Sequence, residues 1–358
     1  MDLPKTLDAL LITNPTNIRY LTGFTGAAPE EREAYVLVTD KETYLFTNSL
    51  YLEQANSLAG ITVIQISREN PIAKEVKRIC EILKVKKLGF EEENLTVAEY
   101  VRLTEQLPGV RFVATKNTIE ESRQIKRADE LASIKNACAV TDACFDYILM
   151  KLMPGVTEPE IAWEIQSFCR KNGATDAFSP IVAFGKNSSQ PHYNTSSHGA
   201  GENQSLALKS NDIVLLDFGA RVNGYCADMT RVIFVGTPKR EWVYAYETVS
   251  EAHQKALDLL SSGERSGSKL DAAAKQVIAE AGLPPYSHSL GHNVGLDIHE
   301  GPRLSIAKEE ELKPGMVFSV EPGVYMEGQY GIRIEDLVRL TSTGIEVLSR
   351  SPKTLTVV

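Results

Sequence analysis

The stretch IVLLDFGARVNGYCADMTRVIFV, residues 213–235, consists of two apolar runs on either side of the dipeptide Asn223-Gly224. An Asn-Gly pair in this setting is the strongest short-range signal for a β-hairpin, because both residues tolerate the positive φ angles of a type I′ turn. If these two residues form the turn, Val222 pairs with Tyr225 on the returning strand. The sequence therefore predicts a hairpin whose register is set by its turn.

Two aspartates of this hairpin are brought to one face by that register. Counting back from the turn places Gly219 opposite Asp228, and the alternation of side chains places Asp217 on the same face. Asp217 and Asp228 are then diagonal neighbours, roughly 7–8 Å apart at the backbone, a gap that two carboxylates converging on a metal ion can fill. A β-bulge would shift this register, and a hairpin with two solvated aspartates is the alternative. Asp217, however, ends an apolar run, where an unpaired charge is costly.

Three of the six histidines fall within SHSLGHNVGLDIHEGP, residues 287–302. His288 and His292 have the i, i+4 spacing of a helix, but the glycines between and after them favour a loop or a strand edge. A lone histidine is more often structural than a ligand, whereas three among glycines indicate a functional site. His299 completes this group.

Two glutamates follow, each in an expected strand. MVFSVEPGVY, residues 316–325, contains Glu321, and GIRIEDLVRL, residues 331–340, contains Arg333 and Glu335 on one face. Taken alone, Arg333 and Glu335 could form a surface ion pair. Together with the aspartates and His292, the glutamates indicate a hard, oxygen-rich site for two divalent ions, which favours Mn²⁺, with Zn²⁺, Co²⁺ or Fe²⁺ able to compete.

These motifs resemble those of the M24 metallopeptidases, and within them the branch of aminopeptidase P and prolidase. NIRYLTGFTG, residues 17–26, resembles the opening of the creatinase-type N-terminal domain of that branch. The resemblance implies an α/β, creatinase-like N-terminal domain followed by an α+β "pita-bread" catalytic domain with a curved antiparallel sheet. We expect these domains to span residues 1–117 and 118–358.

The resemblance also implies the roles of the site residues. Asp217 and Asp228 hold one ion, and Asp228, His292, Glu321 and Glu335 hold the other, with Asp228 and Glu335 bridging. Glu321 is the expected general base for the attacking water.

Four further residues complete the implied machinery. His288 and His299 are expected to bind substrate and stabilise the tetrahedral intermediate. His192 lies where the family has its proton-shuttling histidine, and a loop histidine is the alternative. Arg333 is expected to support a ligand carboxylate through its planar fork. His198 and His253 match no motif position and are expected at the surface.

The substrate implied by the resemblance is a peptide with proline at its second position. We expect an Xaa-Pro aminopeptidase, with an Xaa-Pro dipeptidase (prolidase) as the alternative, in which Arg303 would bind the free carboxylate of proline. A metal-free hydrolase like creatinase and a non-catalytic pita-bread binding module are remote alternatives, because all five ligand positions are intact. Relatives are commonly dimers or tetramers, so a homodimer is expected.

Composition agrees with these expectations. The 358 residues, 43% hydrophobic and 24% charged, are typical of a globular protein and exceed a usual single core, so two domains are expected. The net charge of −9 argues against nucleic acid or an anionic membrane as a partner. The sequence shows neither a secretory leader nor an apolar run of transmembrane length. The five scattered cysteines indicate reduced thiols and a cytoplasmic protein.

The remaining pattern predicts alternating strands and helices in the N-terminal part and four longer helices beyond it. The four are expected at residues 120–153, as one long helix, and at 158–171, 241–260 and 269–281.

Overall fold

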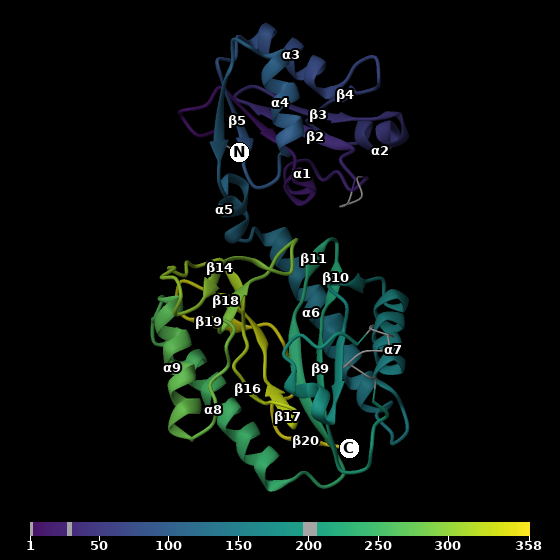
Figure 1. Cartoon of the computed structure of the whole chain (residues 1–358), viewed down its shortest axis with the longest axis vertical. Coiled ribbons are helices and arrows are strands. Elements are labelled where there is room, and N and C mark those ends of the chain that lie inside the picture. Colours follow the sequence, from purple (N-terminus) through teal and green to yellow (C-terminus); the bar gives the residue numbers. More distant parts are fainter. Residues whose placement is uncertain (1–2, 27–30, 196–205) are drawn as a thin grey trace. The chain divides into compact units, whose positions relative to one another are not determined.

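The computed structural model describes residues 3–26, 31–195 and 206–358. The chain divides into two compact units, Met1–Arg123 and Gln124–Val358 (Figure 1). Each unit has its own sheets and its own hydrophobic core, so each is described by itself.

The N-terminal unit is built on one six-stranded mixed sheet in the order β4-β3-β2-β1-β5-β6. Antiparallel pairs join β1 to β2 and β2 to β3, while the other neighbours are parallel. The strands are β1 (Ala9–Ile12), β2 (Ala34–Thr39), β3 (Thr43–Thr47), β4 (Thr62–Gln65), β5 (Lys87–Glu91) and β6 (Arg111–Thr115). The predicted alternation of strands and helices is confirmed, with the turn of the β2–β3 hairpin at residues 40–42.

Both faces of this sheet are covered, because residues that alternate along its strands enter two different cores. Leu11 and Leu37 pack with the side chains of α3 and α4, whereas Leu10 and Val36 pack with those of α1 and α2. The helical segments of this unit are α1 (Pro15–Thr22), η1 (Ser49–Tyr51), α2 (Leu52–Asn56), α3 (Ile72–Leu83), α4 (Val97–Gln106) and α5 (Thr118–Gln124).

The described residues of the second unit form four sheets. A four-stranded sheet has the order β20-β12-β9-β8, and a five-stranded sheet has the order β14-β13-β15-β18-β19. The first comprises β8 (Ile181–Phe184), β9 (Asp212–Phe218), β12 (Met229–Val235) and β20 (Thr356–Val357). The second comprises β13 (Gly291–Asn293), β14 (Glu300–Leu304), β15 (Val317–Val320), β18 (Asp336–Leu340) and β19 (Ile345–Val347). The smaller sheets comprise β7 (Thr175–Asp176), β10 (Ala220–Val222) and β11 (Tyr225–Cys226), and β16 (Gly323–Met326) and β17 (Tyr330–Arg333).

The helices of this unit cover the outer faces of the two large sheets (Figure 1). They are α6 (Ala128–Leu149), α7 (Glu158–Lys171), α8 (Arg240–Ser261) and α9 (Gly267–Glu280), whereas the short η2 (Gly185–Ser189) lies against β17, β8 and β9. Val214 and Leu216 of β9 pack against α6 and α7, whereas Ile213 and Leu215 share a core with α8 and the five-stranded sheet. Asp217 continues this second, inward-facing series.

The expected single helix over residues 120–153 is wrong, because α5 ends at Gln124 and α6 begins at Ala128. Between them the backbone N–H of Lys126 donates to the carbonyl of Gly315 at 3.0 Å rather than to the preceding helical turn. The side chain of Glu130 then accepts from the N–H of Arg127 at 2.7 Å and starts α6 with a capping box. The other three expected helices are present as α7, α8 and α9.

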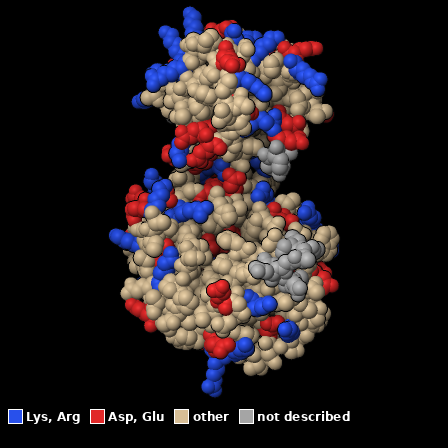
Figure 2. Space-filling view, viewed as in Figure 1, with Lys and Arg blue, Asp and Glu red and all other residues tan. Residues whose placement is uncertain are grey.

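Both signs of charge are interspersed over the face of each unit that Figure 2 shows. Across the described ranges, no helix combines the length and the apolar character needed to cross a membrane.

Candidate metal centre

The hairpin that carries the two aspartates has the predicted register. Asn223 and Gly224 have φ angles of 51° and 88°, as a type I′ turn requires, and Val222 pairs with Tyr225. Thr230 pairs with Asp217 further along, so the register continues without a shift across the interruption between β11 and β12.

Gly219 explains how the hairpin stays closed where the aspartates project. A Cβ atom at Gly219 would lie 1.8 Å from the carbonyl oxygen of Ala227, so any other residue would force the two backbones apart. Asp217 and Asp228 therefore occupy one face, on either side of a position where the strands approach closely.

The two glutamates lie where their strands are interrupted: a strand that ends at the charge of Glu321 was expected, whereas the interruption at Glu335 was not. The expected strand 316–325 is divided into β15 and β16 around Glu321, and the expected strand 331–340 into β17 and β18 around Glu335. Pro322 lacks an N–H and cannot continue the ladder of β15. Both carboxylates line the same cavity as the two aspartates.

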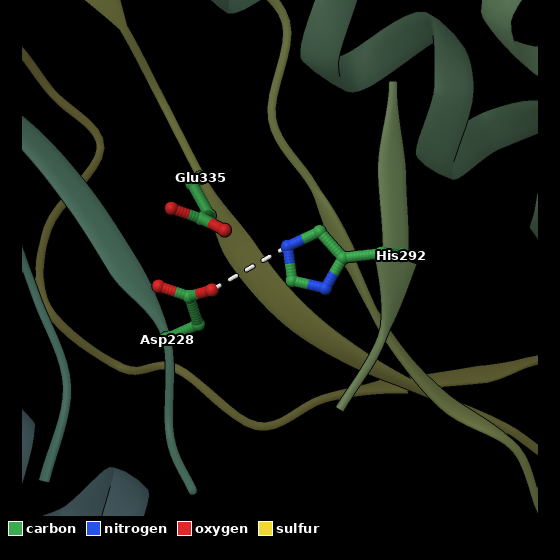
Figure 3. A group of neighbouring side chains, drawn as sticks. All are labelled: Asp228, His292 and Glu335. Carbon is green, nitrogen blue, oxygen red and sulfur yellow. Dashed lines mark ion pairs between the residues drawn. The ribbon is translucent and has the colours of Figure 1, made fainter. Parts of the chain in front are cut away.

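His292 faces this group from β13. Its Nδ1 lies 3.1 Å from the carbonyl oxygen of Asn293, so Nδ1 carries the hydrogen and Nε2 has a free lone pair. Nε2 lies 3.6 Å from Oδ2 of Asp228 and 3.4 Å from Oε1 of Glu321. Ligand atoms of Asp228, His292 and Glu335 lie within 4.8 Å of one another, and Figure 3 shows the three side chains pointing toward one another, His292 from β13, Asp228 from just before β12 and Glu335 from just before β18.

All five predicted ligands line one cavity of about 310 Å³. The other catalytic residues expected from the sequence line the same cavity, as does Arg303. The complete lining is Phe178, Ile181, Pro191, His192, Asp217, Asp228, His288, Ser289, His292, Ile298, His299, Arg303, Glu321, Arg333 and Glu335.

Burial and mutual repulsion raise the pKa values of three carboxylates in the cavity. Burial and the negative charges of Glu335, Asp217 and Glu321 raise the pKa of Asp228 well above its usual value. Burial and the charges of Glu321 and Asp217 do the same to the pKa of Glu335, and burial raises that of Glu321 to about 7. Four carboxylates thus share a buried space. Among the described residues, the cationic side chain that pairs with one of them is that of Arg333, which forms an ion pair with Asp217.

This arrangement fits divalent metal ions. Oδ1 of Asp217 is buried and has no hydrogen-bond partner within the described part of the chain, so it is open to a ligand. Burial lowers the pKa of His292 to about 3, which leaves its imidazole neutral, as a metal ligand must be. Oxygen donors with one imidazole suit Mn²⁺ and similar ions, and their positive charge would offset the repulsion among the carboxylates.

Arg333 donates hydrogen bonds to three neighbouring side chains. Its Nη2 donates to Oδ2 of Asp217 at 2.6 Å, its Nε to Oγ1 of Thr230 at 2.9 Å and its Nη1 to the hydroxyl of Tyr325 at 2.8 Å. Thr230 in turn donates to Oε2 of Glu335 at 2.7 Å. Arg333 therefore orients two of the expected ligands, Asp217 directly and Glu335 through Thr230.

The sequence did not single out Thr230 or Tyr325. Thr230 lies two residues after Asp228 in β12, so the alternation of the strand already placed it on the ligand face. Tyr325 lies in β16, and its hydroxyl is 3.1 Å from Nε2 of His288. Nothing in the sequence marked that contact, because it depends on the packing of β16 against the loop before β13.

The three other expected histidines reach the cavity in different states. Both ring nitrogens of His288 are engaged, Nδ1 by the carbonyl of Ser289 at 2.8 Å and Nε2 by Tyr325, and burial lowers its pKa to about 4. His299 is exposed and its ring meets that of His292 edge to face at 4.5 Å. His192 is exposed on the segment that follows η2.

The expectation that His253 lies at the surface is wrong, because its side chain is 2% exposed. It lies on the buried face of α8, one turn after Val249 and one turn before Leu257, and its Nε2 is 3.5 Å from Oδ2 of Asp336. The helical spacing of those apolar residues was the signal that could have placed it correctly. His198 lies outside the described residues.

Comparisons with known proteins identify the family to which the chain belongs. Residues 132–342 match the family model described as Metallopeptidase family M24, and residues 4–125 match the Creatinase/Prolidase N-terminal domain. The uncharacterized peptidase YqhT of Bacillus subtilis is 34% identical over 352 residues, which cover 98% of this chain and 95% of the relative.

Solved structures of similar length share the whole fold. An Xaa-Pro dipeptidase from Bacillus anthracis superposes with a TM-score of 0.89 at 36% identity, covering 99% of this chain and 96% of that one. An X-Pro aminopeptidase from Thermotoga maritima superposes with a TM-score of 0.88 at 32% identity, covering 99% and 98%. The expected fold, a creatinase-like domain followed by a pita-bread domain, is confirmed.

Proposed function

Because the chain belongs to metallopeptidase family M24 and is a metallo-exopeptidase, we propose that it is an Xaa-Pro aminopeptidase, which removes the residue before proline from the N-terminus of peptides. The observation that carries this proposal is the convergence of four carboxylates, four histidines and Arg333 on one cavity. The size of that cavity, about 310 Å³, suits the two terminal residues of a peptide.

We propose that the five ligands hold two divalent ions, with Mn²⁺ favoured over Zn²⁺, Co²⁺ and Fe²⁺ by the oxygen-rich donor set. When bound, such ions polarise the scissile carbonyl and lower the pKa of the attacking water. Glu321, which lines the cavity with Oε1 3.4 Å from Nε2 of His292, accepts the proton of that water.

The remaining residues act on the substrate. His299, exposed at the cavity wall, donates to the oxygen of the scissile carbonyl as its charge develops. His288 acts indirectly, because its Nδ1 donates to the carbonyl of Ser289 and its Nε2 accepts from the hydroxyl of Tyr325; it holds that hydroxyl in place beside Arg333. His192 protonates the departing proline nitrogen, which belongs to a tertiary amide and must gain a proton to leave.

The proposed proline specificity is supported by the apolar part of the cavity lining. Phe178, Ile181 and Ile298 provide apolar lining beside the charged residues, and a proline ring is apolar. A peptide bond to proline also carries no N–H, so the site needs no acceptor for one.

An Xaa-Pro dipeptidase is the second candidate, and Arg303 favours it. This arginine lines the cavity from β14, where it could bind the free carboxylate of a dipeptide. Its side chain is exposed, however, so it can also turn to solvent when the peptide continues beyond proline. We therefore place the aminopeptidase first.

The deciding experiment is hydrolysis of a dipeptide Xaa-Pro and a tripeptide Xaa-Pro-Xaa by the Mn²⁺-loaded protein, with a chelator-treated sample as control. Cleavage of the tripeptide supports the aminopeptidase. Cleavage of the dipeptide alone supports the dipeptidase, and Arg303→Ala should then raise KM. Activity on neither peptide, with metal bound, would refute the proline specificity.

Two further proposals concern the setting of the enzyme. All five cysteines are free and buried, which supports a reducing, cytoplasmic location. We propose a homodimer, which sedimentation at several protein concentrations would test.

A further inference from the structure

Glu158, the first residue of α7, is fully buried although it carries a charge. The helix does not need it as a cap, because Thr157 and Glu160 already form a capping box there, with Oε2 of Glu160 accepting from the N–H of Thr157 at 2.8 Å. Capping therefore does not explain why Glu158 is buried. Its burial needs another explanation, because removing a charge from water is costly.

Four donors surround this carboxylate, and all of them come from outside α7. Oε1 accepts from the N–H of Phe184 at 2.7 Å and from Nδ2 of Asn187 at 3.0 Å. Oε2 accepts from the hydroxyl of Tyr193 at 2.8 Å and from the N–H of Leu206 at 2.8 Å. Asn187 also donates to the hydroxyl of Tyr193 at 3.0 Å, so the donors are linked to one another.

These donors are neutral, and no cationic side chain pairs with Glu158 among the residues that the structure describes. Burial raises the pKa of Glu158, whereas its four donors act to lower it. The carboxylate is thus held by oriented dipoles alone, an arrangement that fixes the positions of the donors as firmly as that of the acceptor.

His192 lies in the chain between two of these donors, Asn187 and Tyr193. Tyr193 is the next residue, and the carbonyl of Pro191, the preceding one, accepts from Nη1 of Arg333 at 3.3 Å. The imidazole of His192 is exposed and has no hydrogen-bond partner among the described residues. Its position at the cavity wall is therefore set by its neighbours, on one side through Arg333 and on the other through Tyr193.

We propose that Glu158 and Tyr193 are positioning residues, which hold His192 at the cavity wall so that it can protonate the departing nitrogen. This inference rests on the function proposed above for His192. Glu158 holds the hydroxyl of Tyr193 through a hydrogen bond, and Tyr193 in turn fixes the backbone of the adjacent His192. Neither Glu158 nor Tyr193 touches the substrate.

The test compares two buried tyrosines, of which only Tyr193 donates its hydroxyl to Glu158. Tyr193 and Tyr246 are each 3% exposed and belong to the same core, but the hydroxyl of Tyr246 donates to the carbonyl of Lys353 at 3.2 Å instead. Tyr193→Phe should lower kcat roughly 10-fold with unchanged metal content and little change in KM, because a displaced proton donor slows the chemical step. Tyr246→Phe removes a comparable buried hydrogen bond and should leave kcat unchanged.

A double-mutant cycle distinguishes positioning from a general structural role. In a His192→Ala background, measured under single-turnover conditions, Tyr193→Phe should change the rate by less than about 2-fold, because it then has nothing to position. Glu158→Gln should follow the same pattern with a larger loss of kcat, since its amide must point a donor at another donor. Glu160→Gln, at the same helix end, is its control and should keep kcat.

Three results would overturn the inference. The first is an equal loss from Tyr193→Phe with and without His192, and the second is a His192→Ala variant that turns over normally. The third needs no substrate: a crystal structure of Tyr193→Phe or Glu158→Gln in which His192 keeps its place at the cavity wall. Failure of the wild-type protein to hydrolyse Xaa-Pro peptides would refute the proposed function separately, and the crystal structures would still decide whether these residues position His192.

Discussion

Glu335 and Asp336 are neighbours in sequence, and both are buried, yet their charges meet opposite surroundings. Glu335 faces the cavity, where burial and the charges of Glu321 and Asp217 raise its pKa well above the usual value. Asp336 points the other way, toward a group that we call the Asp336 cluster: Asp336, Arg231, His253 and Lys353.

In the Asp336 cluster the one carboxylate is paired with two cations. Nη2 of Arg231 lies 2.7 Å from Oδ1 of Asp336, and Nζ of Lys353 lies 2.8 Å from Oδ2. Although burial alone raises the pKa of Asp336, the positive charges of its neighbours lower it below its usual value. Arg231 also donates to the backbone carbonyls of Thr230 at 3.0 Å and Ser351 at 2.8 Å, so its guanidinium is fully engaged.

The difference separates two uses of buried charge. The cluster joins β12, β18 and the C-terminal segment, so its charges hold the protein together. The cavity leaves its carboxylates with less positive charge than they need, which costs stability and prepares a site for cations. The four predictions that follow test whether this distinction is real, beginning with the largest effect.

Asp228→Asn should reduce turnover roughly 10³-fold or more, because it replaces a charged oxygen donor in the middle of the expected ligand set. Metal bound per chain, measured by mass spectrometry of the purified protein, should fall with it. Asp146→Asn, at an exposed position of α6, is the control and should change neither quantity. A variant that keeps its full metal content and activity would remove Asp228 from the site.

Asp336→Asn should have its effect on folding instead. It leaves Arg231 and Lys353 without their buried counter-charge, and breaking such a pair costs about 3–5 kcal/mol in the free energy of unfolding. Urea denaturation of the metal-free proteins measures this loss. Glu346→Gln, which breaks the half-exposed pairs with Lys135 and Arg339, should cost less than about 1 kcal/mol. Equal losses in the free energy of unfolding for the two variants would show that the buried cluster contributes no more to stability than a surface ion pair does.

His253 should make stability depend on pH. Burial lowers its pKa to about 4, opposed by Asp336 and assisted by Lys353 and Arg231, whereas in the unfolded chain it has the usual value near 6.5. The unfolded state therefore binds the proton first as the pH falls, and stability is lost between about pH 6.5 and pH 4, by about 3 kcal/mol in total.

His253→Gln isolates this contribution, because every other titrating group is present in both proteins. The free energy of unfolding of the wild type should fall more steeply than that of the variant over this range of pH, and the two slopes should agree above pH 7. Parallel curves throughout would mean that the pKa of His253 is the same in the folded and the unfolded protein, so that burial does not disfavour its protonation.

The sequence predicted best what local rules decide. The hairpin of Asp217 and Asp228 followed from one dipeptide and the period of a strand, and its register is confirmed. The ends of α7 were equally local, because Thr157 and the Asn172-Gly173 pair mark them.

What the sequence could not predict depends on contacts between distant residues. The break before α6 arises because the N–H of Lys126 meets the carbonyl of Gly315, and no property of residues 120–153 shows this. The partners of Glu158 come from three separate segments, so a glutamate at a helix start gave no sign of its burial. His253 is different, since its spacing from Val249 and Leu257 already places it on the apolar face of α8.

The last and smallest effect uses Asp228→Asn again, now as a test of stability without metal. If the cavity carboxylates repel one another, removing one charge should raise the free energy of unfolding of the metal-free protein by about 1–2 kcal/mol, the usual gain when a strained functional site is relieved. Adding Mn²⁺ should reverse the order, because the wild type then gains the free energy of binding and the variant gains less. The same substitution would thus stabilise the empty protein and abolish its activity, whereas Asp336→Asn destabilises the protein with or without metal. A metal-free Asp228→Asn variant that is less stable than the wild type would show that the carboxylates are already balanced, and the distinction between the cavity and the Asp336 cluster would fail.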